Sequence, residues 1–114
     1  MKRCDLTLGK LGRKKWRQFA PLLERESATD ADFDLLAQYC VNIDLIQQAQ
    51  ADINKNGVNV LNSAGSLCAN PATKVLSASQ RNNLQIVRDL NLTALSQRKN
   101  PTKGDDADLD ELLG

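Results

Sequence analysis

A row of basic residues near the start of the chain has the types and spacing that suit phosphate binding. The segment KLGRKKWRQF carries four cations on adjoining rows of one helical side and a fifth nearby. The four are Lys10, Arg13, Lys14 and Arg17, and the fifth is Lys15. Such a row can follow the phosphates of duplex DNA by displacing their counterions. The alternative is a solvated basic face that aids solubility, and Trp16 between these cations is interpreted as a core residue.

Other side chains that could take part in catalysis lack the partner residues that catalysis needs. Asp30, Asp32 and Asp34 fall within one helical turn, where they could hold Mg²⁺ or act as acid and base. Capping and the helix dipole explain the same pattern without any ligand. The chain contains no histidine to activate a serine or threonine, and it has no GxxxxGK[ST] phosphate cradle. We therefore expect no enzyme activity, no metal and no cofactor.

The totals of the chain indicate one domain with an uneven charge distribution. The 114 residues carry a net charge of +1, and a chain of this length forms a single core. Residues 1–25 hold eight basic and two acidic side chains, whereas residues 105–111 hold five acids and no base. We expect two different partners for the two ends.

The three cysteines and the hydropathy pattern bear on the compartment. Cys4, Cys40 and Cys68 form no CxxC pair, so we expect neither a disulfide framework nor a zinc site. The basic start is followed by no run of seven apolar residues, so we expect no signal peptide and no membrane span. These features predict a cytosolic protein.

The elements that position the basic row are mostly helical. Apolar spacing predicts a helix over 11–26, and capping signals at Ser27 or Thr29 start a second helix that ends near Gly57. The second helix is apolar on more than one side, which favours a subunit interface as one of its packing partners. A short hairpin follows, with turn residues in NSAG.

Asn70 and Pro71 are typical of a helix start. The stripe of this third helix is Val75, Leu76, Leu84, Ile86, Val87 and Leu90. Thr93 is expected to cap a last short helix before Pro101. The predicted fold is mainly α, with a helical hairpin, a short β-hairpin, a third long helix and a short C-terminal helix. Residues 1–100 form the domain, and 101–114 form a disordered acidic tail.

The tail contains Leu109, Leu112 and Leu113 at i, i+3, i+4 spacing among its acids. This spacing is typical of a short helix that docks on a partner. The alternative is a solvated tail with incidental leucines.

The order of these weak signals resembles the small terminase subunits of tailed phages over about residues 15–99. The matching features are Trp16 and Leu23, TDADFDLLAQYC (29–40), Gly57, NPATKVL (70–76), LNLT (90–93), Ser96 and Arg98. This chain has Asn91 where the family usually carries glycine, and Ala94 where it usually carries proline.

The resemblance implies a non-enzymatic homo-oligomeric ring that recognises double-stranded viral DNA and recruits the large ATPase-nuclease subunit for genome packaging. It also implies that the basic row contacts DNA, that the tail leucines engage the large subunit, and that the protein acts in the cytoplasm of the infected bacterial host. The alternative is a small helical transcriptional regulator, which would also be basic and oligomeric.

Overall fold

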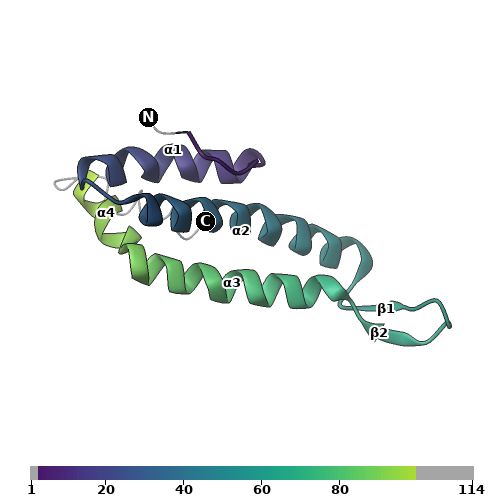
Figure 1. The fold of residues 1–114 in the computed structure, drawn as a ribbon. Coiled ribbons are helices and arrows are strands. Elements are labelled where there is room, and N and C mark those ends of the chain that lie inside the picture. Colours follow the sequence, from purple (N-terminus) through teal and green to yellow (C-terminus); the bar gives the residue numbers. More distant parts are fainter. Residues whose placement is uncertain (1–2, 100–114) are drawn as a thin grey trace.

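Three long helices lie side by side in the computed structural model, which describes residues 3–99. The element order is α1 (Lys10–Arg25), α2 (Asp30–Asn56), β1 (Asn59–Leu61), β2 (Leu67–Ala69), α3 (Pro71–Leu90) and α4 (Leu92–Lys99). Helix α2 lies between α1 and α3, the β-hairpin projects from one end, and α4 crosses the other end (Figure 1). The molecule is elongated, with extents of 55 × 30 × 22 Å. The mainly α fold predicted from the sequence is confirmed.

Helix α1 begins without a side chain of its own to cap it. Its N-cap is Gly9, and the exposed backbone amides are satisfied by Asp44 of α2 instead. The Asp44 carboxylate accepts hydrogen bonds from the backbone N–H of Gly9 at 2.6 Å and of Gly12 at 2.9 Å. A Cβ atom on Gly12 would lie 2.8 Å from the Cys40 carbonyl oxygen. Glycine at this position therefore permits the close approach of α1 to α2.

Helix α2 has the capping pattern predicted for it. The Thr29 hydroxyl accepts from the backbone N–H of Asp32, and the Asp32 carboxylate accepts from the backbone N–H of Thr29, which is a capping box. The helix ends at Gly57, whose φ of +92° suits glycine. The capping explanation of Asp32 is thus confirmed.

The core lies where α1, the first half of α2, the end of α3 and α4 meet. The Trp16 and Phe33 ring centroids are 6.2 Å apart, and Phe19 meets Tyr39 edge-on with centroids 6.1 Å apart. Phe19, Leu36 and Cys40 are completely buried. Trp16 is therefore a core residue, as predicted. Helix α2 packs against both α1 and α3, so along its first half both of its apolar sides have partners within the chain. Beyond Asp44, where α1 begins, Leu45, Ile46 and Ile53 are only half-buried.

Side chains at the base of the β-hairpin clamp it to the two helices that it joins. Strands β1 and β2 pair antiparallel, with Leu61 opposite Leu67. The Asn70 amide donates to Asp52 Oδ1 at 3.0 Å and to the Gly57 carbonyl at 2.9 Å, and Asn70 Oδ1 caps α3. A two-stranded hairpin on its own is only marginally stable in water. The bonds to α2 and α3 therefore help to hold this one in place.

Two predictions for the last helices are wrong. Val75 and Leu84 of the predicted α3 stripe are 42% and 57% exposed. Their places against α2 are taken by the polar residues Ser79 and Asn83, which are buried. Thr93 does not cap the last helix, because α4 already begins at Leu92.

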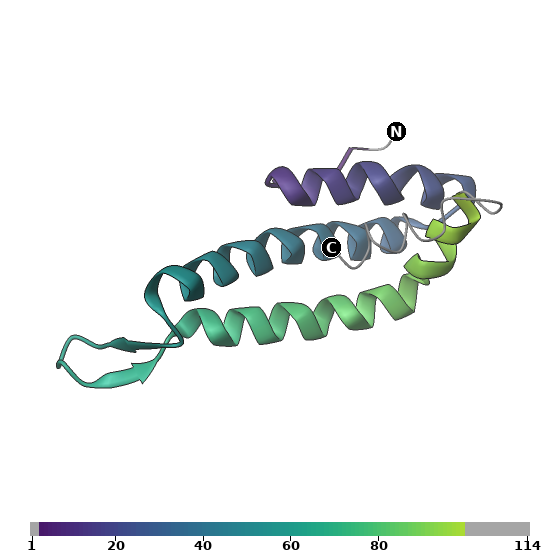
Figure 2. The ribbon, with the colours of Figure 1, turned by 180° about the vertical axis from the view of Figure 1, so that it is seen from behind.

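The reason for the early start of α4 is the conformation of Asn91. This residue ends α3 with φ 54° and ψ 45°, the left-handed region, so the chain leaves the α3 axis at once. Leu92 and Leu95 then pack into the core. Figure 2 shows from behind how their helix, α4, crosses the end of the long helices. Asparagine is the side chain that best replaces glycine in this conformation.

Candidate nucleic-acid interface

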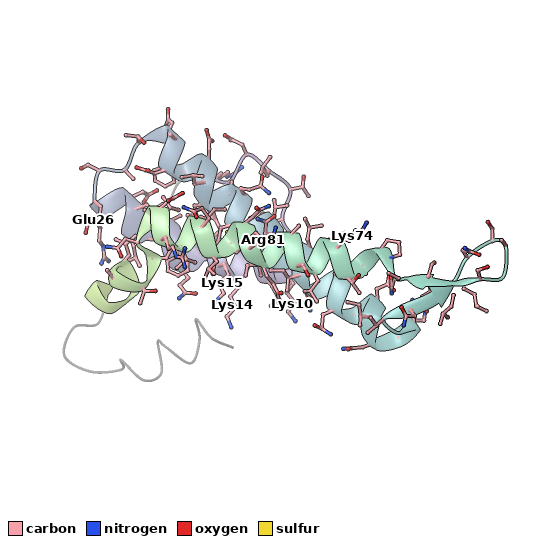
Figure 3. All side chains as sticks on the ribbon, turned by 90° about the horizontal axis from the view of Figure 1, so that it is seen from below. Lys10, Lys14, Lys15, Glu26, Lys74 and Arg81 are labelled. Atoms are coloured by element: carbon pink, nitrogen blue, oxygen red, sulfur yellow. The ribbon has the colours of Figure 1, made fainter. Side chains whose placement is uncertain are left out.

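Helix α1 presents its cations on the side that faces away from the core. Lys10, Arg13, Lys14 and Arg17 are exposed, and Lys15 is half-buried at the border of the packed side. We call these five residues the α1 basic face, and Figure 3 shows Lys10, Lys14 and Lys15 in succession along α1. The structure therefore brings the predicted residues together on one helix.

The local fold explains this exposure. The apolar residues of α1 recur at helical spacing on the opposite side, where they are buried: Trp16, Phe19, Ala20, Leu22 and Leu23. The Asp44 carboxylate of α2 bonds the backbone at the start of α1, so the turn that carries Lys10 and Arg13 is held against α2. The cations thus lie on a helix whose opposite side is packed against the core.

The charges of the three long helices differ in sign. Helix α1 holds six basic residues and one acid, whereas α2 holds five acids and one lysine. Helix α3 holds three basic residues and one acid. Phosphate is therefore attracted to the outer helices and repelled by the central one.

A second basic row runs along α3, and the sequence analysis did not identify it. Its members are Lys74, Arg81 and Arg88, which are seven residues apart and exposed. A spacing of seven is two helical turns, so the three side chains share one face. Figure 3 shows Lys74 and Arg81 on this helix. The i, i+7, i+14 spacing was the signal that could have revealed the row.

A groove runs between the N-terminal segment and α1. Its volume is about 510 Å³, and we call it the N-terminal groove. Leu6, Leu8 and Trp16 supply its apolar lining, and Leu6 is 45% exposed. Three arginines also line it: Arg3, Arg13 and Arg17. The groove thus joins the α1 basic face to an apolar surface.

A smaller hollow of about 270 Å³ lies beside the N-terminal groove and shares Arg3, Leu6 and Trp16 with it. This second hollow is lined by the carboxylates of Asp5 and Asp34. The two neighbouring hollows therefore differ in charge: the N-terminal groove has cations and no carboxylate among its lining residues, whereas the smaller hollow has both.

The reactive groups of the core are held in their neutral forms. Burial raises the pKa of Cys40 to about 12, the charges of Cys4 and Asp44 add to this effect, and Lys15 opposes it. Burial, with a contribution from Cys40, raises the pKa of Tyr39 to about 12. A thiol with this pKa is a poor nucleophile at neutral pH.

The part of the chain with described coordinates, residues 3–99, offers no cluster of three or more His, Cys, Asp or Glu side chains that could hold a metal ion. Over the same range, no helix combines the length and apolar character needed to cross a membrane. Asp30, Asp32 and Asp34 therefore do not come together in such a cluster.

The predicted partner-binding residues of the tail lie outside the described residues. They are Leu109, Leu112 and Leu113, and the acids among them lie outside as well. Their expected role in docking stays a prediction.

Comparison with protein families gives one match. The family model described as "Phage terminase, small subunit" matches residues 12–107 of the 114. The match includes all of the described helices α2, α3 and α4, both strands and most of α1. Searches of curated proteins and of solved structures gave no significant match.

Proposed function

The chain belongs to the small-subunit family of phage terminases, and we propose that it binds double-stranded viral DNA and brings it to the large ATPase-nuclease subunit for packaging. The proposal places this work in the cytoplasm of an infected bacterial host and gives the subunit no catalytic step. Family membership favours packaging over the transcriptional regulator that the sequence left open.

The observation that carries DNA binding is the exposure of four cations on one side of α1. Lys10, Arg13, Lys14 and Arg17 are spaced by three or four residues, and no acid stands between them in the sequence. Consecutive phosphates on one strand of DNA can be neutralised by such a row, with release of counterions. The contact is electrostatic, so it gives affinity and leaves sequence recognition to other contacts.

The salt dependence of binding tests the assignment. Four neutralised phosphates give a slope of log K against log [salt] of about −3.6 per engaged subunit. Replacing Arg13, Lys14 and Arg17 by alanine removes three of the four contacts, so the slope should become shallower, at about −1. The measurement is fluorescence anisotropy with a labelled duplex at several salt concentrations.

The matched control removes the same number of cations from α3. The variant Lys74→Ala, Arg81→Ala, Arg88→Ala should retain most of the slope if α1 is the main DNA contact. A normal slope in the α1 variant together with a reduced slope in the α3 variant would transfer the interface to α3.

Capture of the large subunit is assigned to residues 105–114. Five acids repel phosphate, and three leucines at helical spacing suit an apolar groove on a protein partner. Changing Leu109, Leu112 and Leu113 to alanine, with every acid retained, should abolish co-purification with the large subunit. Capture at wild-type affinity would show that the tail has no such role.

The ring assembly is supported by apolar side chains at the hairpin end. Leu61, Leu67 and Val58 are 70%, 67% and 58% exposed. Large exposed apolar patches mark interaction surfaces, and a heterologous contact closes into a ring when its rotation permits. Native mass spectrometry should show a closed oligomer of many subunits, which the variant Leu61→Ser, Leu67→Ser loses. A monomer or a twofold dimer of the wild type contradicts the ring.

A further inference from the structure

The N-terminal groove combines two surfaces that nucleic acid alone would not use. Its arginines suit negative charge, but Leu6, Leu8 and Trp16 beside them suit apolar side chains. The exposed Leu6 leaves part of this apolar surface in water. An occupant that satisfies both surfaces must be acidic and amphipathic.

We infer that the acidic tail of the same chain, residues 105–114, docks in the N-terminal groove and covers Arg13 and Arg17 until another molecule removes it. The inference rests on the proposed function, because those arginines belong to the α1 basic face and the tail is the segment assigned to the large subunit.

Charge and side-chain type select the tail over another occupant. The tail has five carboxylates, three leucines and no base in ten residues. The hairpin of a second copy is the other apolar candidate, but residues 56–73 carry no charge at all. A hairpin would fill the apolar part of the groove and leave the guanidinium groups unpaired. The neighbouring hollow with Asp5 and Asp34 would repel the tail, which restricts docking to the arginine-lined side.

The chain is long enough for this contact. Helix α4 ends at Lys99 and packs against α1, where Leu95 and Leu23 line the same hollow. The six residue steps from Lys99 to the first tail acid, Asp105, span up to about 20 Å. Arg17 lies eight residues before α1 ends at Arg25, a distance of about 12 Å along the helix. This distance is shorter than the span from Lys99 to Asp105.

Docking of the tail couples the binding of DNA to the binding of the large subunit. A docked tail competes with phosphate for Arg13 and Arg17, so the free subunit binds DNA more weakly than its cations allow. When the large subunit takes the tail, the two arginines become available. By linkage, DNA on the α1 basic face must release the tail to the same extent.

The test uses the full chain with the three tail leucines changed to alanine. This variant keeps all five acids, so general repulsion of DNA by the tail is unchanged, and in an assay without the large subunit the change removes only docking in the groove. It should bind a labelled duplex at least about fivefold more tightly at low salt, the lower end of usual coupling between sites. Equal affinity of variant and wild type overturns the inference.

A second readout needs neither DNA nor the large subunit. Trp16 is the only tryptophan in the chain, so its indole N–H gives one NMR resonance that reports on the groove. The resonance should differ between wild type and the tail variant. The single change Leu6→Ser in the groove should move it to the position of the tail variant, and combining both changes should move it no further.

Two outcomes for this resonance contradict tail docking. One is an identical position in wild type, tail variant and Leu6→Ser protein. The other is a shift that depends on protein concentration and persists in the tail variant, which assigns the groove to a second copy. The salt slope of the α1 variant tests DNA binding separately, so failure of the inference and failure of the proposed function are distinguishable.

Discussion

Where α4 crosses the helices, aromatic and aliphatic side chains form a closed core, whereas at the hairpin end polar side chains hold α2 and α3 together. The hydrophobic cluster contains Phe19, Leu36 and Leu92, and in the described chain it has no member between Ile43 and Ile86. Between those positions the buried residues are Asp44, Ala49, Asn70, Ala72, Ser79 and Asn83. The two ends therefore obtain their stability from different interactions.

The boundary between the ends is marked by a ladder of amide side chains. Gln38 donates to Asn42 Oδ1 at 3.0 Å, Asn42 donates to Asn83 Oδ1 at 2.9 Å, and Asn83 donates to the Tyr39 carbonyl at 3.3 Å. Buried amides of this kind fix the register of two helices at a cost in stability. The core end therefore holds the helices together through apolar packing, while the hairpin end leaves apolar side chains exposed, and the proposed ring would use them.

The largest expected difference comes from the same substitution at the two ends. Leu36 is completely buried and Leu67 is 67% exposed. Leu36→Ala should lower the free energy of unfolding by about 2–5 kcal/mol, because it removes buried methyl groups and leaves a cavity. Leu67→Ala should change it by about 0.5 kcal/mol or less. Urea denaturation followed by circular dichroism, at a protein concentration low enough to dissociate the proposed oligomer, measures both. Equal losses would contradict the distinction between the two ends.

A smaller difference is expected for two carboxylates of α2. Asp44 accepts hydrogen bonds from the backbone of α1 in a buried position. Asp44→Ala leaves those amides unsatisfied and should cost about 1–3 kcal/mol. Asp52 is exposed, and hydrogen bonds from Asn56 and Asn70 lower its pKa.

The matched control Asp52→Ala should cost less than Asp44→Ala, since water can replace its partners. It should also affect hydrogen exchange in the hairpin more than in α1. A larger loss of stability from Asp52→Ala would mean that the polar clamp, and not the α1 cap, is the main carboxylate contribution.

The smallest effect is a pH dependence confined to the core end. Burial raises the pKa of Cys40 from 9.0 to about 12, so above pH 9 the unfolded chain loses a proton that the folded chain keeps. Stability therefore falls as the pH rises from 9 towards 12, and at pH 10 the loss is on the order of 1 kcal/mol. Cys40→Ala should remove this part of the slope, whereas Cys68→Ala in the hairpin should not. Parallel stability–pH curves for wild type and Cys40→Ala would contradict the assignment.

The sequence predicted helix starts and ends correctly where the signal came from a few neighbouring residues. The Thr29 cap, the glycine stop at 57 and the start of α3 at Asn70 and Pro71 depend on a few neighbouring residues, and each is confirmed. The cations of α1 lie on one side because helical spacing determines this. The α3 stripe failed because periodicity does not show which apolar residues find a partner: Val75 and Leu84 fit the pattern and are exposed.

The sequence by itself determined the helical elements, the hairpin between them and the uneven charge, since these follow from spacing, capping and composition. Only the tertiary structure decided that Asp44 caps α1 from 32 and 35 residues away, that α2 lies between α1 and α3, and that three arginines meet Leu6, Leu8 and Trp16 in one groove. The physical reason is that these contacts join residues far apart in the chain, and their partners depend on how the helices pack rather than on any local pattern.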